Sequence, residues 1–202
     1  PDAIRVDTPG DYAHLLRDTG RVEASFARRR ESIRIQVEGL AEAGGGRAVV
    51  EGDLLDEVTA LCEWPTAIMG EFDVEFLGVP PEVLIETMQK NQKYFPVRGE
   101  DGRLLAKFIT VSNIESRDVE QVRAGNERVI RPRLSDAAFF FETDKKTSLA
   151  ERVEKLDSIV FQQQLGTLKD KTDRMVKVAA ALADKIGAPA EQAARAALLS
   201  KT

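Results

Sequence analysis

Apolar residues recur at helical spacing in the first quarter of the chain. Thr8, Pro9 and Asp11 predict a short helix that ends by Gly20, because Thr8 and Asp11 have capping-box spacing and Pro is favoured in a first helical turn. A longer helix with a narrow apolar stripe follows and stops at three glycines, residues 44–46, which we interpret as a flexible hinge. The members of that stripe are Val22, Phe26, Ile33, Val37 and Leu40.

The middle of the chain alternates between helical and strand patterns. Residues 53–63 predict a helix that buries Leu54, Val58, Leu61 and Cys62, and residues 66–72 have the length of a buried strand. Residues 80–92 predict a further helix whose inward positions are Val83, Leu84, Thr87 and Met88. The turn-rich residues 98–102 separate two strand-like runs and predict a hairpin, in which Pro96 places the first strand at a sheet edge.

After Asn113 the pattern is helical to the last residue. Pro132 is expected to bend or break the first of these helices. At least one of three adjacent phenylalanines, residues 139–141, must contact another element or a partner, and the core is the favoured location. Ser148 and Glu151 form a second capping box. A stripe over 167–186 ends at the stop signal Gly187, and Pro189 restarts a helix. The prediction is an α+β fold with a helical arm and hinge over 1–46, a mixed α/β domain over 47–165 and a helical segment over 166–202.

Composition describes a folded, water-soluble chain and excludes several kinds of site. Of the 202 residues 43% are hydrophobic and 31% are charged, and no apolar run is long enough to cross a membrane. The single cysteine, Cys62, excludes a disulfide framework, and the single histidine, His14, excludes a multi-histidine metal site. The chain opens without methionine and closes inside an alanine-rich helical pattern, so we expect an excised piece of a longer cytosolic chain.

Charge is distributed unevenly along the chain. Residues 48–89 hold ten acidic and no basic side chains, whereas the rest of the chain holds 29 basic and 24 acidic ones. Such asymmetry indicates either an anionic partner for the basic part or two solvated faces of one domain. The candidate contacts to a nucleic acid are Arg123, Arg128, Arg131 and Arg133, together with Lys90 and Lys93 beside Tyr94.

Three long runs of the sequence resemble one family. They are EVTALCEWPTAIMGEFDVEFLGVPPEVLIETMQKNQKYFPV, AGNERVIRPRLSDAAFFFETD and LGTLKDKTDRM, and they resemble the bacterial glycyl-tRNA synthetase beta subunit. The resemblance implies an alpha-two beta-two enzyme that joins glycine to tRNA(Gly) in the cytoplasm. ATP with magnesium is used at the alpha subunit, the beta subunit binds much of the tRNA, and the last helices begin a truncated HD-like helical domain. The mixed part resembles the editing-type domain of the phenylalanyl-tRNA synthetase beta subunit.

The motifs of adenylate formation are missing from these 202 residues. Neither HIGH nor KMSKS occurs, so we expect a chain that assists tRNA binding, binds no cofactor and carries no catalytic residues. One alternative is a scaffold for assembly of the alpha and beta subunits, using the acidic face over 48–89. Another is hydrolytic editing of mischarged tRNA around Thr110, Ser112 and Asn113. Editing has little physical motive, because a site that fits glycine excludes larger amino acids by size.

Overall fold

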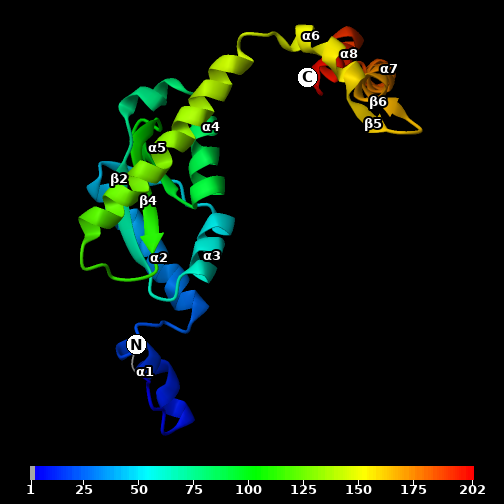
Figure 1. Ribbon diagram of the computed structural model, residues 1–202. Coiled ribbons are helices and arrows are strands. Elements are labelled where there is room, and N and C mark those ends of the chain that lie inside the picture. The colour runs from blue at the N-terminus through cyan, green and yellow to red at the C-terminus, as the bar shows by residue number, and fades with distance from the viewer. Residues whose placement is uncertain (1–2) are drawn as a thin grey trace. The chain divides into compact units, whose positions relative to one another are not determined.

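The computed structural model describes residues 3–202, which form two compact units (Figure 1). The first extends to Phe139 and the second begins at Phe140, so the division falls inside helix α5 (Val119–Asp144). Helices dominate, and they accompany a small antiparallel sheet, which confirms the α+β class.

A four-stranded sheet forms the centre of the first unit. Its order is β1 (Gly46–Ala48), β3 (Phe95–Gly99), β4 (Leu104–Ser112) and β2 (Thr66–Glu71), and all neighbours are antiparallel. The predicted strand and the predicted hairpin are therefore confirmed.

The edge position expected for the proline-bearing strand is wrong, because β1 covers that side of β3. Strand β1 pairs only with residues 97–99 and stops short of Pro96, so the missing N–H costs no ladder bond there. The carbonyl of Pro96 accepts a hydrogen bond from the N–H of Val49 at 2.8 Å, and the β3–β4 register shifts directly beside this proline.

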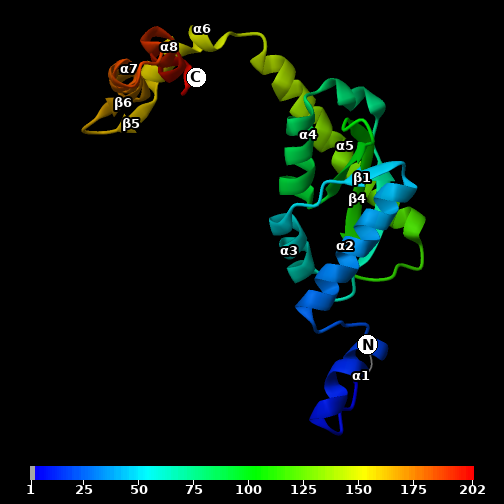
Figure 2. The ribbon, with the colours of Figure 1, turned by 180° about the vertical axis from the view of Figure 1, so that it is seen from behind.

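Helices α2 (Phe26–Ala43) and α3 (Gly52–Leu61) cover one face of the sheet (Figure 2). The two helices follow the predicted amphipathic patterns, although Phe26 of the predicted stripe is exposed and Leu61 is exposed rather than buried. Gly44 caps α2 and Gly46 begins β1, so these glycines form a tight connection between a helix and a strand. The core on this side contains Ile33, Val37, Ala41, Leu54, Leu55, Val58, Cys62, Phe95, Val97 and Ile109.

The opposite face carries α5, with α4 (Pro81–Glu86), the 3-10 helix η2 (Val74–Gly78) and the π-helical turn η3 (Thr87–Asn91) beside it (Figures 1 and 2). Leu84 and Met88 are fully buried, as the predicted helix over 80–92 requires. Helix α5 continues through Pro132 and is not broken there. Pro132 is exposed, so the helical carbonyl that lacks a donor at this point can be hydrated.

The chain begins with η1 (Pro9–Asp11) and α1 (Tyr12–Asp18), close to the predicted short helix. The predicted capping box is wrong, because the hydroxyl of Thr8 bonds to the Asp11 carboxylate at 2.9 Å and accepts no backbone N–H. Because this hydroxyl group bonds to the Asp11 carboxylate, it does not cap the first turn of the helix.

The second unit consists of α6 (Leu149–Arg152), η4 (Val153–Ser158), α7 (Leu168–Ile186), α8 (Ala190–Leu199) and a small hairpin. The Ser148 capping box is confirmed, and Gly187 ends α7 in the left-handed conformation (φ 70°). The hairpin, β5 (Val160–Gln162) and β6 (Gly166–Thr167), corrects the expectation of a purely helical end. Phe139 and Phe140 are each 63% exposed, so the favoured core position is wrong for these two, and a contact with a partner stays a prediction.

Candidate nucleic-acid interface

Polar contacts hold α5 against the sheet. The Nε of Arg123 donates to the carbonyl of Met69 on β2 at 3.0 Å, and its Nη1 contacts Glu120 at 2.7 Å. The Glu127 carboxylate accepts the backbone N–H of Glu71 at 3.0 Å. Strand β2 is an edge strand, so these side chains satisfy backbone groups that no neighbouring strand could reach. Arg123 and Glu127 therefore position the helix.

A buried tyrosine supplies a further tether to α5. The Tyr94 hydroxyl donates to Oδ1 of Asn126 at 2.6 Å, and the tyrosine ring stacks on Phe108 with centroids 4.5 Å apart. Phe108 lies opposite Gly70 on β2, where a Cβ would stand 2.5 Å from the phenylalanine ring. Burial raises the pKa of Tyr94 to about 12. Asn126 escaped the sequence prediction because an isolated asparagine in a helix carries no pattern.

The arginines of α5 differ in how they are engaged. Arg128 and Arg133 are exposed, and neither forms an ion pair with any residue in the described range 3–202. Arg131 is well exposed and pairs with Asp73 at 3.3 Å. A surface pair of this kind contributes little stability, so Arg131 can exchange its partner for another anion. Arg123, by contrast, is committed to the contacts with β2.

The predicted cations do not share one surface. Helical spacing places Arg128 and Arg131 about 60° apart around α5 and puts Arg133 about 140° from Arg128. Lys90 lies in η3 and pairs with Glu86 at 2.6 Å, whereas Lys93 follows η3 and pairs with Glu57 at 2.8 Å. The hydrogen bond that Lys90 donates to the Glu86 carboxylate raises the pKa of Lys90.

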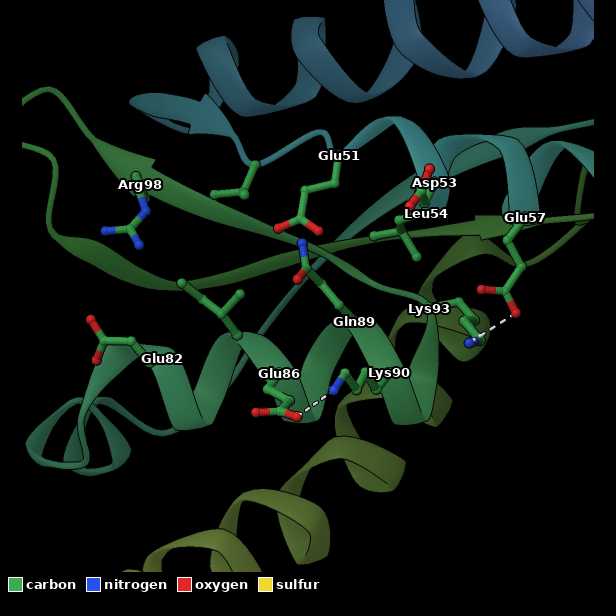
Figure 3. A pocket seen from close by; sticks show the side chains of 12 residues that line it. Glu51, Asp53, Leu54, Glu57, Glu82, Glu86, Gln89, Lys90, Lys93 and Arg98 are labelled. Atoms are coloured by element: carbon green, nitrogen blue, oxygen red, sulfur yellow. Dashed lines mark hydrogen bonds and ion pairs between the residues drawn. The ribbon is translucent and has the colours of Figure 1, made fainter. Parts of the chain in front are cut away.

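These two lysines line a groove of about 550 Å³ between α3 and the α4–η3 segment (Figure 3). Its wall also holds the carboxylates of Glu51, Asp53 and Glu82, none of which has an ion-pair partner within residues 3–202. Gln89 points into the groove beside Glu51, and its Nε2 is buried without a hydrogen-bond partner among the described atoms. Among the described residues the groove thus presents three carboxylates without an ion-pair partner and one buried amide donor without a hydrogen bond.

Other sequence candidates have structural roles. The oxygen of Asn113 accepts the backbone N–H groups of Glu63 and Trp64 at 2.6 and 3.1 Å, so it fastens the end of α3 to β4. Cys62 is buried, as predicted, and burial raises the pKa of its thiol. A thiol in that state is a poor nucleophile. Over residues 3–202 no His, Cys, Asp and Glu side chains gather in threes suited to a metal ion. Nor does that stretch contain a helix with the length and apolar character needed to span a bilayer.

Comparison with known proteins accounts for the whole chain. The family model of the glycyl-tRNA synthetase beta subunit matches residues 1–202. A glycine–tRNA ligase beta subunit from Hahella chejuensis is 57% identical over 202 residues, which cover 100% of this chain and 29% of the relative. Its counterpart from Psychromonas ingrahamii is 55% identical over 197 residues, covering 98% of this chain and 29% of the relative. That from Shewanella piezotolerans is 49% identical over 200 residues, covering 99% and 29%.

A match of this extent places the chain among the subunits of aminoacyl-tRNA synthetases. It belongs to the glycyl-tRNA synthetase beta subunit family, as the resemblance of its three sequence runs predicts. The chain spans less than a third of the length of these relatives.

Proposed function

We propose that this chain acts as a stretch of the beta subunit of a cytoplasmic glycine–tRNA ligase and assists the binding of tRNA(Gly). The partner is an alpha subunit, in an alpha-two beta-two assembly, and ATP with magnesium is used there. The chain itself is non-catalytic and binds no cofactor. The names of the relatives support the enzyme, and the open arginines of α5 support the RNA contact.

The proposed RNA contact depends on the positive charge of the exposed arginines of α5. Among the described residues 3–202, Arg128 and Arg133 have no ion-pair partner, and the partner of Arg131, Asp73, is solvent-exposed. A folded RNA is bound largely through phosphates and 2′-hydroxyl groups, for which exposed arginines are suitable donors. The contacts of Arg123 and Glu127 with β2 hold α5 in place, so the open arginines project from a rigid element.

The test uses the intact alpha–beta enzyme with Arg128→Gln, Arg131→Gln and the double variant, because these two arginines lie about 60° apart on one side of α5. Each substitution should raise the apparent KM for tRNA and leave kcat unchanged, because a positioning contact to phosphate is lost. The slope of log affinity against log salt should fall by about one for each phosphate contact removed. Arg133→Gln is the matched control, because Arg133 is also exposed but lies about 140° from Arg128 around α5, so its loss should alter the slope less. An unchanged tRNA titration in the double variant would refute the RNA contact.

Assembly with another protein is the second candidate function. The groove of Figure 3 exposes three carboxylates without ion-pair partners among residues 3–202, which suits a basic segment of a partner. Replacing Glu51, Asp53 and Glu82 by their amides should weaken alpha–beta association in sedimentation and leave tRNA binding intact. Normal association would count against this role.

The likeness of the mixed unit to the editing-type domain of phenylalanyl-tRNA synthetase stays a proposal about fold alone. It is not extended to hydrolytic editing, because the side-chain oxygen of Asn113 already accepts two backbone N–H groups.

A further inference from the structure

Helix α7 carries apolar residues on a broader face than the second unit covers. Thr172 and Ala183 are buried, and helical spacing places Asp173, Lys177 and Asp184 on a charged face about 110° around the helix from them. About 90° from the buried pair on its other side lies a stripe of apolar residues, in which Val178 is 59%, Leu182 56% and Ile186 78% exposed. An apolar stripe of this spacing is the usual mark of a helix face that packs against another element.

Val178 and Leu182 of this stripe, together with Met175 and Ala179 of α7, line a groove of about 530 Å³ within the second unit. The remaining walls are Phe161 and Leu165 from the β5–β6 hairpin and Ala197 from α8. Only Lys171 and Arg174 contribute charge, and the Nζ of Lys171 lies 4.0 Å from the centroid of the Phe161 ring. The groove is therefore an apolar channel with a basic rim.

The second unit exposes more apolar residues than it buries. Within residues 140–202 the buried apolar side chains are Leu156 and Ala183, while Val160 and Leu165 on the hairpin are exposed along with the α7 stripe. A small unit gains too little from such a core to be stable alone, and a contiguous apolar surface on it indicates a contact with other protein.

We propose that this groove is covered by another part of the same beta subunit, a segment outside these 202 residues that is apolar in its centre and flanked by carboxylates. The inference rests on the proposed function, in which the chain is a stretch of a longer subunit. The matched relatives carry roughly 70% of their length outside this stretch, which provides ample chain for the contact. Carboxylates flanking the apolar centre would pair with Lys171 and Arg174 at the rim.

The experiment measures thiol reactivity in the full-length beta subunit without the alpha subunit. Leu182→Cys and Val178→Cys place a thiol in the groove, and Asp184→Cys places the matched control on the exposed opposite face of α7. Labelling is followed by mass spectrometry of the α7 peptide, so cysteines elsewhere do not interfere. The groove thiols should react at least about tenfold more slowly than the control, because a covered thiol reacts only when its cover opens.

Every other outcome overturns the proposal. Equal labelling at all three positions would show that no segment covers the groove. Protection that arises only when the alpha subunit is added would assign the cover to that subunit. Protection already present in the 202-residue chain would assign it to residues 3–139 or, where it rises with protein concentration, to a second copy. Aminoacylation of the same variants, measured with the alpha subunit, separates a failure here from a failure of the proposed function.

Discussion

Replacing Tyr94 by Phe removes one hydroxyl group that joins the sheet to α5. Tyr94 is only 3% exposed, and its hydroxyl donates to Oδ1 of Asn126 at 2.6 Å. The ring stack on Phe108 survives the substitution, so the change isolates the hydrogen bond. The substitution should lower the free energy of unfolding by about 1–2 kcal/mol, because the hydrogen bond is lost and the Asn126 oxygen is left without this donor. In a double-mutant cycle with Asn126→Ala, the coupling energy should be about 1 kcal/mol.

The same hydroxyl predicts a dependence of stability on pH. The folded pKa of Tyr94, about 12, lies above the ordinary value near 10, because burial disfavours the phenolate. Because the pKa is higher in the folded state, the contribution of Tyr94 to the free energy of unfolding is complete below about pH 10 and declines as the pH rises toward 12. Over that interval the wild-type chain should lose up to about 3 kcal/mol more stability than the Tyr94→Phe variant.

Urea unfolding followed by the fluorescence of Trp64 provides the measurement. Trp64 is the only tryptophan, and it lies in the unit that contains Tyr94, with the Arg21 guanidinium 5.3 Å from its ring. Tyr12→Phe is the matched control, because Tyr12 is the only other tyrosine and is exposed. Equal stability of Tyr94→Phe and wild type at pH 7, with no divergence above pH 10, would refute this account of the tether.

Three further substitutions test the packing. Gly70→Ala should destabilise the first unit by about 1–3 kcal/mol in urea unfolding, because the new Cβ would meet the Phe108 ring; an unchanged midpoint would contradict the close packing. Leu134→Ala, at a fully buried site on α5, should cost about 2–5 kcal/mol, and the exposed Val129→Ala far less; similar values for the two would be inconsistent with the observed burial. Thr167→Ala removes the cap of α7 and should cost about 1 kcal/mol of helix stability by circular dichroism, with Thr147→Ala as a comparison outside that cap.

Elements with a strong local pattern could be predicted from the sequence. The stripe through Ile33 and Val37 predicted α2, and the turn between Val97 and Leu104 predicted the hairpin of β3 and β4. Strand β1 escaped prediction because three residues, Gly-Arg-Ala, carry no alternation. The small hairpin β5–β6 escaped because its strand residues 160–162 are all exposed, so no polar and apolar faces differ.

For the candidate site, the residue types could be predicted from the sequence, but the partners of the charged side chains could not. The sequence alone determined that residues 48–89 are acidic, that α5 is rich in arginine and that Lys90 follows Glu86 by one helical turn, since a pair at that spacing is local. Only the tertiary structure decided that Arg131 forms an ion pair with Asp73 and that Arg123 donates a hydrogen bond to the Met69 carbonyl. Those partners are more than 50 residues apart in the chain. Charge and periodicity can be read from residue types, whereas the partner of a charge depends on which distant segments the packed core brings together.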